Sequence, residues 1–233
     1  MQAFGGIMSV VGEEGRPPVR VGPSIIDQGT ALWAAVGILC ALYRRRDAGK
    51  GGVVDVSLFE TAAAWMVMHA AQYLGSGDIP SRHGSGANGI VPYKAYRTKD
   101  GDLVVAAAND SLFRKFCAVL SRPELSEDAK YKTNPDRVKH AQALYPMIEK
   151  EMLGKTNAQW SALLDAAGVP CAPVQNVAQM LEHEQLQALG LLQPVPGSSK
   201  PLIGLPISFD GHRPLPRSAS PALGQHTSEV LGK

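Results

Sequence analysis

One acidic residue, Asp27, lies where a carboxylate is well placed for nucleophilic chemistry. It follows an irregular segment, VGPS (residues 21–24), and two β-branched residues, and a long apolar segment begins directly after it. We expect that segment to form a helix from about Gln28 to Arg46, so that Asp27 lies where unpaired N–H groups and the helix dipole favour an anion. An ionised, oriented and partly desolvated carboxylate in such a position is suited to attack an electrophilic carbonyl.

The same aspartate has a purely structural explanation. Asp is among the preferred residues at a helix N-cap, where it contributes about 1 kcal/mol without any chemistry. Residue type and spacing leave both explanations open. The predicted helix is apolar on nearly every face, so we expect it to be buried in a core. The cationic residues 44–46 and Gly49 predict its C-terminus.

A glycine-rich segment is the second candidate site. Its sequence GSGANG matches the dinucleotide-binding pattern G-x-G-x-x-G, but a loop precedes it and a proline follows it, so the strand and helix that this pattern requires are missing. We expect backbone that approaches a ligand or closes over a site, with a plain flexible linker as the alternative. The candidate residues are Gly84, Ser85, Gly86, Ala87, Asn88 and Gly89, with His83 beside them as the histidine most suited to acid–base chemistry.

Composition and spacing disfavour several classes of protein. A net charge of +2 with 19% charged residues gives no reason to expect nucleic acid or a membrane surface as a partner. The six histidines and three cysteines show no metal-ligand spacing, so we expect no metal site. The first residues show no signal-peptide pattern, and unpaired cysteines are typical of a reducing compartment, so we expect a soluble, cytoplasmic protein.

The order of elements predicts a protein of mixed α and β structure. Residues 53–58 predict a strand, and Ser57 with Glu60 predicts the capped start of a helix that ends near residue 74. Helix, strand and helix in this order predict an α/β layer with parallel pairing. A linker follows, and beyond it an α+β domain is predicted. The Asp-Gly pair at residues 100–101 predicts a hairpin of strands at residues 93–97 and 103–107. Helices are predicted at about 111–120, 136–153, 157–167 and 177–189. Asn109 or Asp110 predicts the capped start of the first of these, and Thr156 with Gln159 predicts a capping box for the third, which Gly168 ends.

Several motifs resemble those of the class III CoA-transferase family, also called the formyl-CoA transferase or CaiB/BaiF family. The first three are RVGPSIID (residues 20–27), GILCAL (37–42) and GKGGVVDVSL (49–58). The likeness continues through YRTKDG (96–101), AGVPCAPV (167–174) and LGQHT (223–227), and so covers essentially the whole chain. It implies an enzyme that moves CoA from an acyl-CoA to a free carboxylic acid, with CoA as a substrate and without a metal or organic cofactor.

The resemblance places the family's catalytic aspartate at Asp27, with Gln28 and His83 as neighbours of the site. In the family this carboxylate attacks the thioester to give an aspartyl–acyl anhydride, and the CoA thiolate then attacks the aspartyl carbonyl. The incoming carboxylate takes the CoA through the reverse sequence. A glycine-rich loop shields the intermediate from water, and residues 84–89 occupy its place with three non-glycine residues where well-known members have consecutive glycines.

The fold implied by the resemblance is α/β, a Rossmann-like large domain with a smaller α+β domain, in an interlocked dimer. Residues 1–76 then form the C-terminal part of the large domain, residues 77–185 the small domain, and residues 186–233 a segment that returns to the large domain. We expect a shortened chain, because the family's first strands and helices come before the residue that matches residue 1 here. Such a chain acts as a homodimer or is completed by an N-terminal partner chain, and binds CoA poorly alone.

Two alternatives stay open. The α-methylacyl-CoA racemases share the fold and have an aspartate at the same position, which they use as an acid or base, although AAAND (residues 106–110) resembles the transferases more. The other alternative is a non-catalytic fragment or subunit that keeps the dimer-forming surface. The resemblance leaves the donor and acceptor acyl groups open, since Asp27 is common to enzymes of many substrates.

Overall fold

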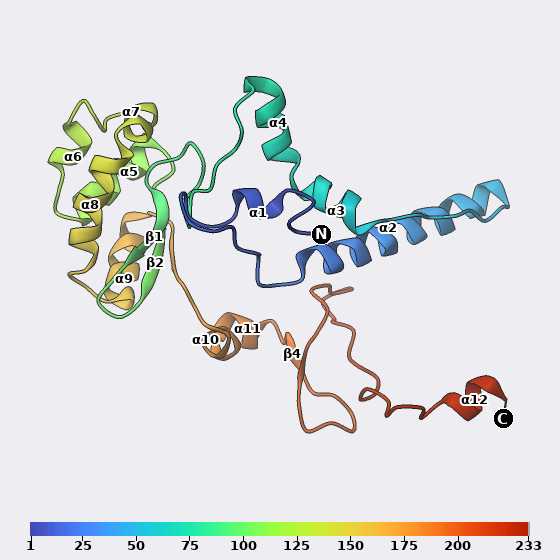
Figure 1. The fold of residues 1–233 in the computed structure, drawn as a ribbon. Coiled ribbons are helices and arrows are strands. Elements are labelled where there is room, and N and C mark those ends of the chain that lie inside the picture. The colour runs from blue at the N-terminus through green and yellow to red at the C-terminus, as the bar shows by residue number, and fades with distance from the viewer. Residues whose placement is uncertain (233) are drawn as a thin grey trace. The chain divides into compact units, whose positions relative to one another are not determined.

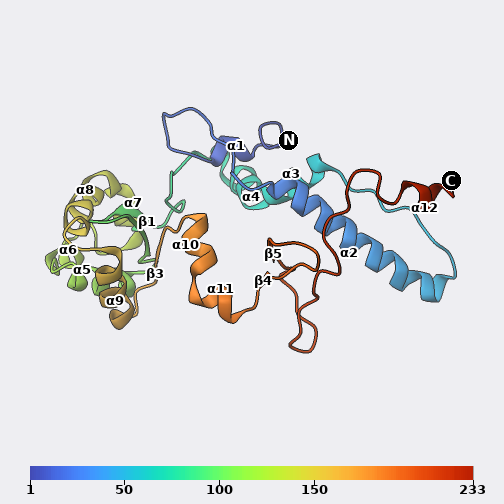
Figure 2. The same cartoon turned by 90° about the horizontal axis from the view of Figure 1, so that it is seen from below.

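The computed structural model describes residues 1–232 as two compact units, divided after Pro173. In the first unit the helices are α1 (Ile7–Val10), α2 (Ile25–Ala48), α3 (Leu58–Trp65), α4 (Val67–Ser76), α5 (Asp110–Val119), α6 (Glu124–Glu127), α7 (Asn134–Lys139), α8 (Ala141–Met152) and α9 (Asn157–Ala167). Its strands are β1 (Tyr93–Arg97), β2 (Asp102–Ala106) and β3 (Cys171–Pro173). The second unit contains α10 (Val177–Glu182), α11 (Glu184–Ala188), β4 (Leu192–Gln193), β5 (Leu202–Ile203) and α12 (Thr227–Leu231), as Figures 1 and 2 show.

Strands β1 and β2 form an antiparallel hairpin, with Tyr93 opposite Ala106 and Arg97 opposite Asp102. The turn contains the Asp-Gly pair at residues 100–101, so the hairpin predicted from that pair is confirmed. Strand β3 adds to β2 in antiparallel fashion, which gives the sheet order β1-β2-β3. The sheet is therefore built from local pairing and one later strand.

The largest buried cluster, here called the hairpin core, forms where this sheet meets helices α5, α8 and α9 (Figure 1). Trp160 is 1% exposed, and its indole N–H donates to the carbonyl oxygen of Met152 at 2.8 Å. The polar atom of this large side chain is thus paired, so burial of its rings stabilises the fold without an unsatisfied donor. The other members are Val91, Tyr96, Leu103, Val105, Ala107, Phe113, Phe116, Cys117, Leu120, Leu125, Tyr131, Leu144, Ile148, Met152, Leu164 and Val169.

Local hydrogen bonds account for the ends of several helices. At α5 the side chain of Asn109 accepts a backbone N–H at 2.9 Å, and at α3 Ser57 accepts one at 3.1 Å. Thr156 and Gln159 form the predicted capping box of α9, and Gly168 ends that helix with a φ of 68°. These helix ends confirm the predictions made from residue type and spacing.

The predicted strand at residues 53–58 is wrong, and so is its parallel pairing. Residues 51–57 have no regular secondary structure and pair with no strand within residues 1–232, and Val53 is 85% exposed. β-branched residues favour extended backbone, but a strand also needs a neighbour for its N–H and C=O groups. Both sheets in the described part of the chain are antiparallel.

Three helices predicted as continuous are each divided in two. The divisions fall at Met66 between α3 and α4, at His140 between α7 and α8, and at His183 between α10 and α11. His183 has extended backbone, and its Nδ1 accepts the N–H of Gln185 at 3.1 Å, so it acts as the N-cap of α11. Histidine is not a usual capping residue, which is why the sequence pattern did not reveal this break.

Helix α2 has the predicted C-terminus, since Gly49 follows it with a φ of 66°. The prediction that the helix is buried is wrong, because Ile26 and Gly29 are its buried residues while Leu32 and Leu39 are 62% and 65% exposed. Only its first turns lie beside α3 (Figure 2). By length and composition α2 could also cross a membrane, with 11% of the apolar window buried, but core helices of soluble proteins share that composition.

The second unit is made of short elements joined by loops. Helix α10 begins with a capping box of Asn176 and Gln179, and β4 pairs with β5 in antiparallel fashion. Arg213 donates to the carbonyl oxygens of Leu189 and Leu205, each at 2.9 Å, and so ties two loops together. The division of the chain at residues 76 and 185 stays a prediction.

Candidate active site

Asp27 lies in the first turn of α2 as the third helical residue, three positions after the N-cap Ser24. The cap position therefore belongs to Ser24, whose side chain makes no capping hydrogen bond. A carboxylate in this turn is close to unpaired N–H groups and to the positive end of the helix dipole. Asp27 is exposed, so the partly dry environment expected for it is not formed by residues 1–232.

Hydrogen bonds hold the backbone on both sides of Asp27. Before it, the N–H of Val21 donates to Oε1 of Gln2 at 2.8 Å, and Nε2 of Gln2 donates to the carbonyl oxygen of Val21 at 3.2 Å. After it, the hydroxyl of Thr30 lies 2.8 Å from both the carbonyl oxygen of Ile26 and the hydroxyl of Thr61 on α3. The turn that contains Asp27 is thus held by contacts from two other segments.

Gly29 lets α2 approach α3 closely in this same turn. A Cβ atom at Gly29 would lie 3.0 Å from Cγ2 of Thr61 and 3.0 Å from ring atoms of Trp65. Ile26 and Ala62 are buried beside this contact, at 3% and 0% exposure. The two buried residues of α2 therefore lie in the part of the helix that holds Asp27.

A cavity of about 370 Å³ adjoins Asp27. Arg20 lines it, and a guanidinium there is suited to meet an anionic group of a ligand. Arg20 is the first residue of the motif RVGPSIID, but no feature of the sequence predicted it as a site residue. Gln28, a predicted neighbour of the site, is exposed and is not part of this lining. The other lining residues are Met1, Gln2, Ala3, Met8, Ile26 and Leu58.

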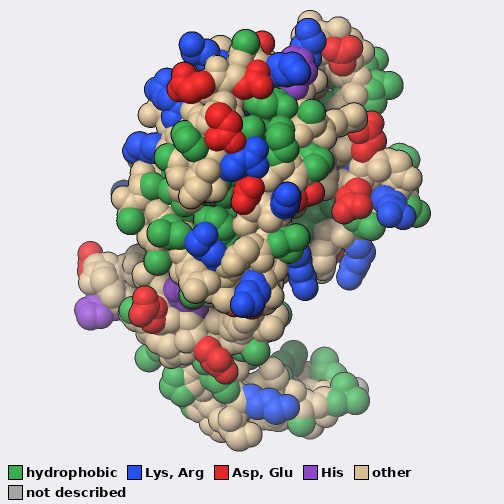
Figure 3. All heavy atoms as spheres, turned by 90° about the vertical axis from the view of Figure 1, so that its left-hand side faces the viewer, with side chains coloured by type: hydrophobic (Ala, Val, Ile, Leu, Met, Phe, Trp, Pro, Cys, Tyr) green, Lys and Arg blue, Asp and Glu red, His purple; other side chains and the backbone are tan. Residues whose placement is uncertain are grey.

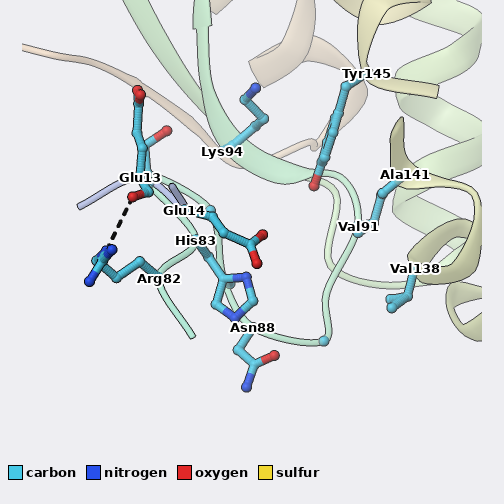
Figure 4. A pocket seen from close by; sticks show the side chains of 15 residues that line it. Glu13, Glu14, Arg82, His83, Asn88, Val91, Lys94, Val138, Ala141 and Tyr145 are labelled. Atoms are coloured by element: carbon cyan, nitrogen blue, oxygen red, sulfur yellow. Dashed lines mark hydrogen bonds between the residues drawn. The ribbon is translucent and has the colours of Figure 1, made fainter. Parts of the chain in front are cut away.

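The glycine-rich loop lines a second cavity, of about 460 Å³ (Figure 4). All six predicted loop residues and His83 contribute to its wall, so the structure brings these candidates together. Asp27 is not among its residues, and the two cavities share no lining residue. The remaining wall consists of Glu13, Glu14, Arg82, Val91, Lys94, Val138, Ala141 and Tyr145.

Two of the three loop glycines have conformations that other residues rarely adopt. Gly84 and Gly89 have φ values of 60° and 71°, in the left-handed region. The non-glycine residues hold the loop through hydrogen bonds instead. Oγ of Ser85 accepts the N–H of Ala95 at 3.0 Å, and Nδ2 of Asn88 donates to Oε1 of Gln72 at 2.9 Å.

Lys94 and Tyr145 form a polar wall of the loop cavity that sequence reasoning missed. Nζ of Lys94 lies 2.8 Å from Oε1 of Glu149 and 4.7 Å from the ring centroid of Tyr145. Burial raises the pKa of Tyr145 and the charge of Glu149 adds to this, so the phenol keeps its proton at neutral pH. These residues come from β1 and α8, and no local pattern shows that a strand and a distant helix meet at one cavity.

His83 is exposed, and its Nε2 lies 3.4 Å from Oγ of Ser81. In Figure 4 its ring and the carboxylate of Glu14 lie on the same side of the cavity, with the hydroxyl of Tyr145 across from them. The cavity therefore presents polar side chains that can donate hydrogen bonds to a ligand and accept them from it. Within residues 1–232, no group of three His, Cys, Asp or Glu side chains is placed to hold a metal ion.

One face of the molecule carries charges of both signs. On the face that Figure 3 shows, Lys and Arg side chains alternate with Asp and Glu side chains. Among the exposed ion pairs, Arg97 lies 3.2 Å from Asp102. Interspersed charges of both signs differ from the continuous basic surface that nucleic-acid binding requires.

Comparison with known proteins identifies close sequence and structural relatives. The model of CoA-transferase family III matches residues 1–227. An acyl-CoA transferase of Fusarium pseudograminearum is 35% identical over 235 residues, and succinyl-CoA:glutarate CoA-transferase of Mus musculus is 32% identical over 232 residues. A crystal structure of a CaiB/BaiF family protein from Brucella suis superposes with a TM-score of 0.86 at 32% identity, covering 99% of this chain and 61% of that one.

The chain spans about half the length of the curated relatives it matches. The matches to the Fusarium and mouse proteins each cover 98% of this chain, but 51% and 53% of the respective relative. The structural match shows that the mixed α and β architecture, with its small sheets, is that of CaiB/BaiF family structures. The relatives' activities belong to proteins about twice as long.

Proposed function

The chain belongs to CoA-transferase family III, and we propose that it takes part in the transfer of CoA from an acyl-CoA to a carboxylic acid, with Asp27 as the nucleophile. The observation that supports this most is the family match over residues 1–227 combined with the position of Asp27 in the first turn of α2, beside a cavity that contains Arg20. A carboxylate needs no proton removed before it attacks, so this site requires no general base for the first step.

In the proposed reaction a carboxylate oxygen of Asp27 attacks the thioester carbonyl. The C–S bond breaks, CoA leaves as the thiolate, and an aspartyl–acyl anhydride remains. The thiolate then attacks the aspartyl carbonyl, which releases the donor acid and leaves an aspartyl–CoA thioester. The acceptor carboxylate attacks this thioester to form a new anhydride, and the thiolate takes the new acyl group, which restores Asp27. The first-turn N–H groups of α2 stabilise the charges that develop at this carbonyl.

The glycine-rich loop is proposed to shield the anhydride from water, because hydrolysis would waste the donor thioester. Its cavity is lined by protonatable groups, including His83 and Tyr145, and by flexible glycines that permit close approach to a ligand. Asp27 adjoins a different cavity within this chain. The proposal therefore includes a bound state in which the loop and the aspartate enclose the same acyl group.

The exposed surface of α2 supports association with a further polypeptide. Large apolar side chains on this helix include Leu32, Leu39 and Tyr43, which are 62%, 65% and 69% exposed. Exposed apolar area of this kind marks an interaction surface. We propose that a second copy of the chain or an N-terminal partner chain covers α2 in the cytoplasm and makes Asp27 less accessible to water.

The test begins with calorimetric titration of the purified chain with CoA, followed by CoA-exchange assays. Succinyl-CoA and other short acyl-CoAs are offered with glutarate or oxalate as acceptors, because some relatives act on such acids. Asp27→Asn is expected to abolish exchange, whereas Asp47→Asn, an exposed acid near the other end of the same helix, leaves it unchanged. Deuterium exchange at the acyl α-carbon without any CoA exchange would contradict the proposal.

A chain that binds no CoA at millimolar concentration would exclude a self-sufficient transferase. The assay is then repeated with a candidate N-terminal partner chain present. CoA exchange that appears only with both chains and disappears in Asp27→Asn would support the proposed chemistry. If Asp27→Asn prevents assembly and the unsubstituted protein shows no measurable turnover, the result would instead favour a non-catalytic subunit.

A further inference from the structure

Helix α7 contacts the C-terminal end of the glycine-rich loop through hydrogen bonds. Its N-cap is Thr133, whose Oγ1 accepts the N–H of Asp136 at 3.4 Å, so the capping position is already filled. The side chain of Asn134, the first helical residue, is therefore not needed as a cap and can form other hydrogen bonds. Its Nδ2 donates to the carbonyl oxygen of Gly89 at 2.8 Å, and its Oδ1 accepts the N–H of Val91 at 3.0 Å.

Both hydrogen-bonding groups of this amide contact the loop backbone. The two bonds hold the peptide groups on either side of residue 90, so they fix the direction in which the chain leaves the loop. An aspartate in place of Asn134 could accept from Val91 but could not donate to Gly89. The asparagine side chain is thus matched to this pair of backbone groups.

Arg137, one turn later on α7, holds the same point of the loop from the core. It is 0% exposed, and its Nε donates to the carbonyl oxygen of Val91 at 2.6 Å. Its other donors reach Asp110 at 2.8 Å and the carbonyl oxygen of Tyr131 at 3.0 Å, which satisfies a charge that would otherwise be costly to bury. Val91 is therefore held at both its N–H and its C=O.

Two other contacts of the loop are exposed to solvent. The bond from Asn88 to Gln72 joins two exposed side chains. The N–H of Gly84 donates to the carbonyl oxygen of Gly12 at 2.8 Å, at a loop residue that is also exposed. Water competes for such exposed partners, and the bond from Asn134 to Gly89 is exposed as well. The bonds to the N–H and C=O of Val91 are partly buried and buried, so they open less readily than these.

We propose that Asn134 is a positioning residue for the shielding loop, one that sets the loop over its cavity by clamping Gly89 and Val91. This inference rests on the proposed function, in which the loop excludes water from the anhydride. Without the clamp, water reaches the anhydride and attacks its acyl carbon. The products are the free donor acid, the regenerated Asp27 carboxylate and released CoA, so the net reaction becomes hydrolysis of the acyl-CoA.

Two substitutions separate the two hydrogen bonds. Asn134→Leu removes both at similar side-chain volume, whereas Asn134→Asp keeps the acceptor for Val91 and removes the donor to Gly89. Asn109→Asp is the matched control, because it adds the same charge in the same domain and aspartate is an equally good N-cap for α5. Melting curves of all three variants establish that they fold.

The first measurement is amide hydrogen exchange at Val91 in the full chain. Asn134→Leu is expected to accelerate exchange roughly 30-fold, the effect of losing two hydrogen bonds, while Asn134→Asp changes it less and Asn109→Asp leaves it unchanged. The second measurement is the ratio of acyl-CoA hydrolysis to CoA transfer, with the partner chain present if transfer requires it. This ratio is expected to rise about tenfold in Asn134→Leu and less in Asn134→Asp.

The outcomes separate this inference from the function on which it rests. Unchanged exchange at Val91 in Asn134→Leu would show that the clamp does not hold the loop. Faster exchange with an unchanged ratio of hydrolysis to transfer would show that Asn134 holds the loop but does not affect the shielding of the anhydride. If the wild-type protein transfers no CoA under any of these conditions, the proposed function fails and the positioning role fails with it, whatever the exchange shows.

Discussion

Helices α8 and α2 are both rich in apolar residues, but α8 buries one face in the hairpin core whereas most of α2 is not buried. Helix α8 has 12 residues and buries Leu144, Ile148 and Met152, which follow one another at intervals of four and form a single stripe. Helix α2 has 24 residues with apolar side chains all round, and it buries two. A single stripe needs one neighbour, which the chain supplies, whereas α2 needs neighbours on every side.

The largest contrast between these regions is expected for one substitution made in both. Leu144→Ala removes a side chain that is 0% exposed and leaves a cavity in the hairpin core, at a cost of about 2–5 kcal/mol in the free energy of unfolding. Leu39→Ala removes a side chain that is 65% exposed and changes stability by less than about 0.5 kcal/mol. Urea unfolding of both variants checks the difference. Equal losses would mean that α2 is covered in solution even in the isolated chain.

The reactivities of Cys117 and Cys40 test the same difference between the hairpin core and α2. Burial raises the pKa of Cys117 in the hairpin core to about 12, so at pH 8 on the order of one thiol in 10⁴ is ionised. Cys40 on α2 is exposed. We expect a thiol reagent to modify Cys40 rapidly and Cys117 only after unfolding, as followed by mass spectrometry with Cys40→Ser as the control. A partner that covers α2 is expected to slow the reaction of Cys40 alone.

Two helical glycines test whether the start of α2 is packed as the structure describes. Gly75 on α4 has no atom within 4 Å of an added Cβ, so Gly75→Ala is expected to stabilise the protein by up to about 1 kcal/mol. At Gly29 the added Cβ would lie 3.0 Å from Thr61 and Trp65, so Gly29→Ala is expected to destabilise by about 1 kcal/mol or more. Thermal melts of the pair give the sign directly. A stabilising Gly29→Ala would show that α2 and α3 do not approach closely in solution.

The smallest effect is expected for the partly exposed ion pair between Arg122 and Glu124. The hydrogen bond from Arg122 lowers the pKa of Glu124. A lowered folded-state pKa contributes stability above the unfolded value of about 4.3, and this is lost as the pH falls through the folded-state pKa. Glu124→Gln is therefore expected to lower the urea midpoint slightly at pH 7 and not at pH 3. A difference that persists at pH 3 would point to packing rather than charge.

The parts of the fold that depend on neighbouring residues could be predicted from the sequence. The hairpin followed from Asp100 and Gly101, and the helix starts at Ser57 and Asn109 followed from side chains that bond to the backbone within three residues. The strand at residues 53–58 could not be judged in this way, because its pairing depends on a partner strand elsewhere. The burial of α2 failed for the same reason, since apolar composition shows what a helix requires and not what covers it.

The candidate site could likewise be predicted only where its residues are close together in the sequence. The placement of Asp27 in the first turn of a long helix was predictable from residue order, and so was the gathering of His83 with the glycine-rich loop, which adjoins it in sequence. Lys94 and Asn134 were missed because Lys94 contacts α8 and Asn134 contacts the loop from α7, a distant part of the chain in each case. No sequence window short enough to show a pattern includes both partners of such a contact.

The burial of Trp160 has a consequence for optical spectroscopy. Of the three tryptophans, Trp160 is 1% exposed in the hairpin core, whereas Trp33 and Trp65 in and beside α2 are 46% and 47% exposed. An indole in a dry interior emits at shorter wavelength than one in contact with water, and dissolved iodide quenches only those that it can reach. One emission spectrum of the unlabelled protein therefore contains two separable signals, one for the integrity of the core and one for whatever covers α2.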